Sequence, residues 1–132
     1  LPLCYNFSLV QDYLNQPDVQ KALGVSKKWS PCNRAVDLVM VYTGDWMVDF
    51  EDDIALVLDS GHPVMIYAGE YDYICNWIGN KAWTDTFNWT GKADYALAVN
   101  KTWTVDGVSA GSFRAAKGLT FIKVHNAGHM VP

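Results

Sequence analysis

Charged residues are scarce in this 132-residue sequence and make up 18% of it. Acidic residues outnumber basic ones, 14 against 10, so the net charge is −4 when the histidines are neutral. A chain with this charge has no positive field to attract phosphates, and no nucleic-acid partner is expected. Half of the residues are apolar, which indicates a packed globular core and argues against disorder.

Long apolar runs are also missing. None approaches the roughly 20 residues that cross a bilayer, so no membrane span is expected. The first ten residues lack the basic segment that opens a signal peptide, and we expect any export signal to lie upstream. Cysteine occurs only at positions 4, 32 and 75, with no C-x-x-C pair, which excludes the usual zinc frameworks. We expect neither a metal nor another cofactor.

Aromatic residues and glycosylation sequons are plentiful by contrast. Six Trp and seven Tyr exceed what a small core needs, so some rings are expected to line a pocket or a covered surface. Three N-x-S/T sequons begin at Asn6, Asn88 and Asn100. Together with an odd number of cysteines, they favour a glycosylated protein of the secretory route whose disulfide partners lie on other sequence.

Helical patterns dominate the first half of the chain. Ser8 is expected to cap a short helix over residues 9–14, and Pro17 to open a second one that carries Val19, Leu23 and Val25. Apolar residues at positions 50, 54, 57 and 58 predict a third helix after Asp49, with acidic residues 51–53 at its positive end. Ser60 and Gly61 are expected to end it.

Apolar strands alternate with helices after this point. Residues 64–68 form an uninterrupted apolar run, typical of a strand buried on both faces of a parallel sheet. Asn76 is expected to cap a helix over residues 77–87. Two β-rich segments follow, around 95–103 and 113–116, and the last strand covers 119–124. This order predicts an α/β fold, and part of a mostly parallel sheet rather than a complete small fold.

Two loops at the carboxyl ends of the predicted strands carry candidate catalytic groups. The loop after residues 64–68 holds Glu70, Asp72 and Cys75, and the loop after the last strand holds His125 and His129. A carboxylate on one loop and a His on the next suit an oriented imidazole base. The alternative is that Asp72 caps the following helix and His129 is a solvated loop residue.

A nucleophile is suggested by residues 107–111, which read Gly-Val-Ser-Ala-Gly and match the G-x-S-x-G elbow. That motif works at a strand-to-helix turn, whereas the sequence on both sides of Ser109 is of β type and favours a hairpin. Hydrolases with this elbow also carry Ser before the acid, and Ser109 follows Asp72. We therefore do not expect Ser109 to be the nucleophile.

Two further interpretations are disfavoured. His125 and His129 would bind a metal at i, i+4 spacing only on a helix, and Asn126-Ala127-Gly128 is a poor helix sequence. Cys75 could act as a nucleophile with His129 as its base, but no oxyanion element accompanies it, and an inert buried thiol is the more common fate.

Three motifs taken together resemble the C-terminal part of the serine carboxypeptidases. They are "GDWM" (44–47), "YAGEYDYICNWIGNKAW" (67–83) and "HNAGHMVP" (125–132). Residues 3–25 resemble the helical segment that precedes this part. The resemblance divides the chain into residues 1–43, a helical lead-in, and 44–132, a sheet region with the acid and His loops. It implies an incomplete α/β-hydrolase fold and a vacuolar, lysosomal or secreted peptidase that acts on peptide and protein C-termini.

Individual roles also follow from the resemblance. Asp72 looks like the triad acid and His129 like the general base. Trp46, Ile74 and Cys75 match positions that line the pocket for the penultimate side chain, and Tyr5 and Met130 match positions near the departing residue. Cys75 is then a free, poorly accessible thiol beside the site, and Cys4 and Cys32 are half-cystines with partners elsewhere.

The resemblance leaves out part of the family's machinery. The Gly-Glu-Ser-Tyr-Ala-Gly block that carries the nucleophile is absent, as are the oxyanion donors and the residues that grip the substrate carboxylate. The nucleophile is therefore expected on a missing N-terminal segment or subunit, and the isolated chain is expected to be inactive. The alternative is a non-catalytic remnant or a glycosylated binding domain.

Overall fold

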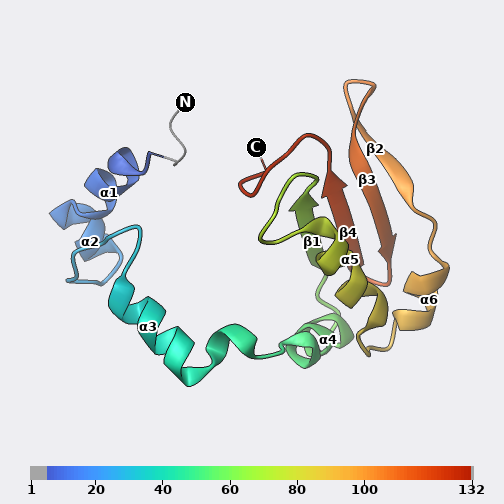
Figure 1. Cartoon of the computed structure of the whole chain (residues 1–132), viewed down its shortest axis with the longest axis horizontal. Coiled ribbons are helices and arrows are strands. Elements are labelled where there is room, and N and C mark those ends of the chain that lie inside the picture. The colour runs from blue at the N-terminus through green and yellow to red at the C-terminus, as the bar shows by residue number, and fades with distance from the viewer. Residues whose placement is uncertain (1–5, 132) are drawn as a thin grey trace. The chain divides into compact units, whose positions relative to one another are not determined.

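A computed structural model describes residues 6–131 (Figure 1). Its internal contacts divide the chain into two compact units, Leu1–Val48 and Asp49–Pro132, which are described separately. Within the described residues, no helix is both long enough and apolar enough to cross a membrane.

The first unit is helical. It contains α1 (Ser8–Leu14), α2 (Pro17–Ala22), α3 (Arg34–Thr43) and a 3₁₀ turn, η1 (Asp45–Met47). The prediction that Ser8 caps α1 is wrong, because Ser8 is itself the first residue of α1 and Phe7 stands at the cap position. Asn6 Oδ1 accepts the Ser8 N–H at 3.0 Å. Pro17 does open α2, where its fixed φ suits the first helical turn. The sequence patterns above do not predict α3, which Asn33 caps by accepting from the N–H groups of Ala35 and Val36.

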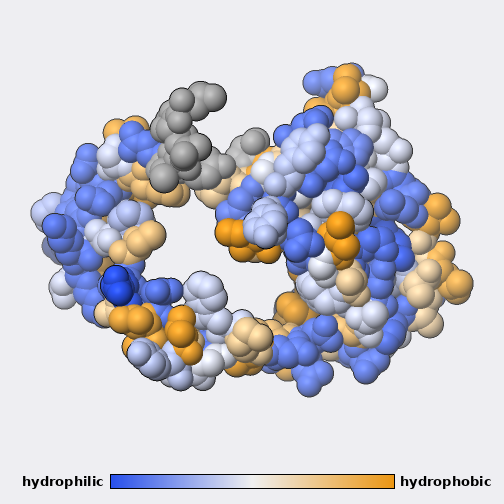
Figure 2. All heavy atoms as spheres, viewed as in Figure 1, coloured by the Kyte–Doolittle hydropathy of each residue, from blue (hydrophilic) through white to orange (hydrophobic). Residues whose placement is uncertain are grey.

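Hydrogen bonds of Asn15 connect α1 to the loop that follows α2. Its amide nitrogen donates to Gln11 O at 2.7 Å and to Trp29 O at 3.1 Å, and its oxygen accepts from Trp29 N–H at 2.8 Å. None of the described residues of this unit is buried. Exposed apolar side chains lie along α3, and apolar side chains also lie on the surface of the second unit (Figure 2).

The second unit contains a four-stranded mixed sheet and three helices. Its elements are α4 (Glu51–Asp59), β1 (Val64–Gly69), α5 (Trp77–Thr86), α6 (Lys92–Leu97), β2 (Lys101–Val105), β3 (Val108–Ala116) and β4 (Leu119–Val124). The strand order is β1-β4-β3-β2, with β1 parallel to β4 and the other two pairs antiparallel. The predicted α/β class is confirmed, but α6 occupies part of the segment 95–103 predicted as β.

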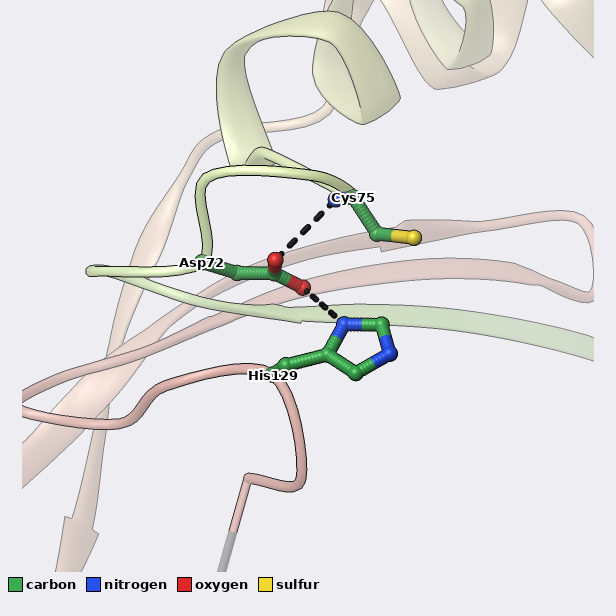
Figure 3. A group of neighbouring side chains, drawn as sticks. All are labelled: Asp72, Cys75 and His129. Atoms are coloured by element: carbon green, nitrogen blue, oxygen red, sulfur yellow. Dashed lines mark hydrogen bonds and ion pairs between the residues drawn. The ribbon is translucent and has the colours of Figure 1, made fainter. Parts of the chain in front are cut away.

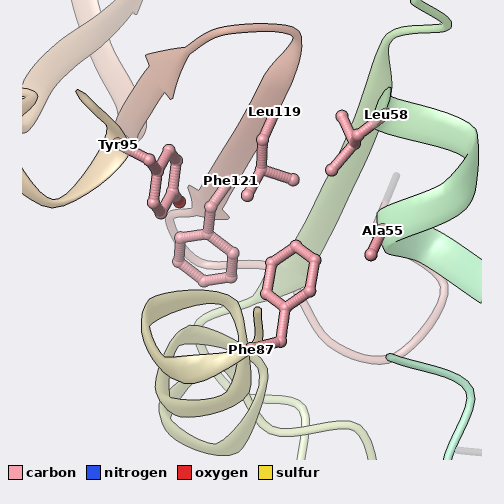
Figure 4. Packing of buried hydrophobic residues seen from close by; sticks show 6 residues of the cluster. All are labelled: Ala55, Leu58, Phe87, Tyr95, Leu119 and Phe121. Atoms are coloured by element: carbon pink, nitrogen blue, oxygen red, sulfur yellow. The ribbon is translucent and has the colours of Figure 1, made fainter. Parts of the chain in front are cut away.

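Alternate side chains of β4 point into one core. Leu119 and Phe121 are buried there (Figure 4), because side chains two residues apart share a face of a sheet. The rest of the buried cluster comes from the helices and the residues next to them: Ala55, Leu58, Phe87 and Tyr95. The prediction that residues 64–68 are buried on both faces is wrong in this chain, since Met65 and Tyr67 are each 59% exposed.

A two-residue turn joins β2 to β3. Asp106 and Gly107 both have left-handed backbones, with φ of 50° and 78°, as hairpin turns of this kind require. Ser109 therefore lies in β3 near the tip of a hairpin, which confirms that it is not on a strand-to-helix elbow. Its hydroxyl oxygen lies 3.5 Å from His125 Nδ1.

Candidate active site

The register of the parallel strands brings two loops together. The last residues of β1 and β4, Gly69 and Val124, are direct partners. Both following segments, 70–76 (the acid loop) and 125–131 (the His turn), therefore leave the sheet at the same edge. The Tyr71 N–H also donates to Ala127 O at 2.9 Å, so the two segments are joined by their backbones.

Asp72 and His129 meet between these segments (Figure 3). His129 Nδ1 lies 3.0 Å from Asp72 Oδ2, and the other carboxylate oxygen accepts from the N–H groups of Ile74 and Cys75. An ionised carboxylate only accepts hydrogen bonds, so Nδ1 carries the proton that faces Asp72. The other ring nitrogen points away from the carboxylate. The side chain of Asp72 is 4% exposed and that of His129 is 55% exposed.

Three N–H donors keep the Asp72 carboxyl ionised despite its burial. Burial is the largest influence and raises the pKa, but hydrogen bonds from His129 and from the N–H groups of Cys75 and Ile74, with the charge of His129, hold the pKa below its ordinary value of 3.8. A pKa lowered by folding contributes stability above the ordinary value, and this contribution disappears as the pH falls through the folded-state pKa.

We therefore expect acid to remove the stabilising effect of Asp72. The difference in unfolding free energy between wild type and Asp72→Asn should shrink as the pH falls below about 3.8. Thermal unfolding of both proteins from pH 7 to pH 2 measures this difference. A difference that stays the same or grows below that pH would contradict the assigned hydrogen bonds.

The residues after Asp72 hold the acid loop in place. Asn76 caps α5, as predicted, by accepting from Gly79 N–H at 2.8 Å. One turn later, the side-chain amide of Asn80 donates back to Cys75 O at 2.9 Å and its oxygen accepts from the Trp83 indole. The motif "ICNWIGN" therefore forms a rigid helix start directly after the acid.

The other predicted site residues that the structure describes are more exposed to solvent than Asp72. Ile74 is 80% exposed, and Trp46 and Met130 are also exposed, with Trp46 in the first unit.

Cys75 is a free cysteine, as expected, but its predicted poor accessibility is wrong because it is exposed. Cys32 is free and exposed too. Tyr5 and Cys4 lie outside the described residues. The three sequon residues Asn6, Asn88 and Asn100 are exposed.

A metal site is the alternative use of the same side chains. The potential ligand atoms of Asp72, Cys75 and His129 all lie within 4.8 Å of one another. However, both carboxylate oxygens already accept N–H hydrogen bonds, and His129 Nδ1 is one of the donors. We interpret the cluster as a hydrogen-bonded acid–imidazole pair. The His125–His129 metal hypothesis needs a helix, and this segment is a turn.

Comparison of the sequence with known proteins gives matches to carboxypeptidases. The family model described as serine carboxypeptidase matches residues 2–132. Carboxypeptidase Y of Schizosaccharomyces pombe is 43% identical over 98% of this chain and 13% of its own length, and serine carboxypeptidase-like 47 of Arabidopsis thaliana is 45% identical over 98% of this chain and 26% of its own.

A solved structure gives the same fold. Kex1(Δ)p, a prohormone-processing carboxypeptidase from Saccharomyces cerevisiae, superposes with a TM-score of 0.68 and 26% identity, over 96% of this chain and 28% of that one. The chain spans only 13% and 26% of the lengths of the two sequence relatives named above. The matches cover nearly the whole chain, and the chain belongs to the serine carboxypeptidase family.

Proposed function

We propose that this chain supplies the acid and the general base of a serine-type carboxypeptidase that hydrolyses the C-terminal peptide bond of peptides and proteins. One observation carries the proposal: a buried Asp72 carboxylate lies 3.0 Å from Nδ1 of a half-exposed His129. Such a pair orients the ring and stabilises the imidazolium that forms when the outer nitrogen takes a proton.

In the proposed reaction, Nε2 of His129 takes the proton of a Ser hydroxyl as the oxygen attacks the last peptide carbonyl. The same proton then goes to the departing amino acid, and an acyl-enzyme ester remains. His129 next takes a proton from water, the water oxygen attacks the ester, and the proton returns to Ser as the shortened peptide leaves. Asp72 stays ionised throughout, and no cofactor is needed. The Ser belongs to a preceding segment or subunit of the enzyme.

The remaining assignments are part of the same proposal. Ile74 and Cys75 are assigned to the pocket for the penultimate side chain, and Met130 to the region near the departing residue. Trp46 and Tyr5 match family positions with these same two roles. The exposure of Trp46, Ile74 and Met130 supports this, since a binding surface must be accessible. The exposed sequon residues support a secretory route to the vacuole, the lysosome or the outside of the cell.

A hybrid enzyme tests the proposal. In the Schizosaccharomyces pombe relative, the segment that matches this chain is replaced by residues 1–132. We expect the hybrid to release the C-terminal amino acid from a blocked dipeptide, because the chain then supplies Asp72 and His129 to the relative's Ser. Product release is followed by amino-acid analysis.

The hybrid with His129→Ala is the matched control and is expected to keep only a small residual activity. A hybrid that is folded and as abundant as the parent, yet releases no amino acid, would favour the non-catalytic alternative. Equal activity of the hybrid with and without His129 would contradict the assigned base.

A further inference from the structure

Glu70, in the acid loop, makes three hydrogen bonds, two to the end of β4 and one to the His turn. Its Oε1 accepts from Lys123 Nζ at 3.0 Å, and its Oε2 accepts from the Asn126 backbone N–H at 3.2 Å. Its own N–H donates to Val124 O at 2.8 Å. One side chain, two residues before Asp72, therefore binds both the end of β4 and the turn that leads to His129.

The His turn passes through a left-handed residue that is held by hydrogen bonds. Asn126 has φ of 55°, a conformation that Asn adopts more readily than other residues with a side chain, so backbone strain there is small. Glu70 accepts the N–H of this residue, and the Tyr71 hydroxyl lies 3.4 Å from its side-chain oxygen. The imidazole of His129 is 55% exposed, so its position depends on the turn that carries it more than on packing around the ring.

Glu70 is itself fixed by its cation. Lys123 Nζ lies 4.8 Å from the centre of the Trp77 ring, at the start of α5. The hydrogen bond from Lys123, followed by that from Asn126 N–H, lowers the pKa of Glu70 below 4.5. Both oxygens are therefore free of protons near neutral pH and can accept. The side chains of Lys123 and Glu70 are 20% and 29% exposed, so the pair is partly shielded from water.

We propose that Glu70 is a positioning residue, which holds the His turn so that His129 stays hydrogen-bonded to Asp72. Glu70 touches neither Asp72 nor His129 in the described contacts, and it acts through the backbone at Asn126. Its consequence for catalysis rests on the proposed function, whereas its effect on the Asp72–His129 hydrogen bond does not. The competing explanation is an ion pair that only adds stability.

Titration of the Asp72 carboxyl carbon by NMR in the 132-residue chain separates the two explanations. Glu70→Gln keeps the size of the side chain, but its amide group turns a donor toward Lys123 or toward Asn126 N–H. If the His turn loosens, Asp72 loses its bond from His129 and its pKa rises toward 3.8. Removal of a nearby negative charge acts in the opposite direction and lowers the pKa of Asp72. The sign of the shift therefore identifies the cause.

Two further variants make the test specific. Lys123→Met removes the ion pair but leaves Asn126 N–H bonded to Glu70, so it should raise the pKa of Asp72 less than Glu70→Gln does. Asp94→Asn removes the exposed ion pair of Asp94 with Lys117, 3.6 Å apart, and should leave the pKa of Asp72 unchanged. An unchanged or lowered pKa of Asp72 in Glu70→Gln, with the amide spectrum of the fold retained, would overturn the proposal. So would an equal rise in Lys123→Met.

Kinetics of the hybrid enzyme give a second, independent readout. Misplacing a base affects the transition state more than substrate binding, so Glu70→Gln should lower kcat about 10- to 100-fold and leave KM nearly unchanged. Asp94→Asn should change neither constant. A rise in KM alone would contradict the positioning role. An inactive wild-type hybrid would count against the proposed function, and the NMR titration would still decide the role of Glu70.

Discussion

Asp72→Asn is expected to lower kcat of the hybrid enzyme by about 10⁴-fold, which is the loss seen when the acid of such a triad becomes an amide. The amide has about the same size as the carboxylate, so the fold should survive. It can turn a donor toward the ring, and this favours the tautomer with the proton on the outer nitrogen, where the base must be free. KM should change little, since the acid acts through His129 and not on the substrate.

The matched control is Asp106→Asn in the hairpin turn. Asp106 is exposed and has a left-handed backbone that Asn adopts readily, so this variant should keep its activity and stability. Steady-state rates on a blocked dipeptide measure both variants. A loss below tenfold for Asp72→Asn would show that the carboxylate does not orient the base.

Gly69→Ala is expected to disturb the site by a purely steric effect. A Cβ at Gly69 would lie 2.5 Å from Ala127 O and closer still to Gly128 O, which are backbone atoms of the His turn. Such atoms cannot rotate away, so the turn must shift, at a cost of about 1–3 kcal/mol in the free energy of unfolding. Because the turn carries His129, the hybrid with this variant should also lose most of its kcat.

The same substitution within the His turn supplies the control. Gly128 has no atom within 4 Å of the position where a Cβ would lie, and its φ is not positive. In the 132-residue chain, Gly128→Ala should therefore leave the midpoint of urea unfolding nearly unchanged, while Gly69→Ala should lower it. Equal midpoints for the two variants would mean that the close approach at Gly69 is not a constraint.

The sequence was sufficient for the elements that have strong local signals. Residues 119–124 form β4 within the predicted bounds, and the helix after Asn76 begins where its cap predicts. Helix α6 has the sequence KADYAL, in which Ala, Lys and Leu favour a helix, and it was missed because its second half was grouped with the β-type residues that follow it. Its Tyr95 is 2% exposed in the core. Helix α3 was missed although Asn33 is a favourable cap, because its Val-rich sequence has high β propensity.

The candidate site was predictable only in part, because some of its features depend on tertiary contacts and not on residue types. Asp72 and His129 follow two apolar strands, and the expectation that parallel strands end at one edge suffices to bring them together. The role of Glu70 depends on which residue of β4 faces it and on the left-handed turn at Asn126, and neither follows from residue types. The accessibility of Cys75 likewise depends on which segments cover it.

The central claim is that Asp72 and His129 act as one unit, and a double-mutant cycle in the hybrid enzyme tests it most directly. The kcat values of Asp72→Asn, His129→Ala and the double variant are compared with that of the unmodified hybrid. Residues that act as a unit show strongly non-additive losses, because the acid has no function once the base is gone. We predict that the double variant is no slower than His129→Ala alone. Losses that multiply would mean that the two residues act independently, and would contradict the account.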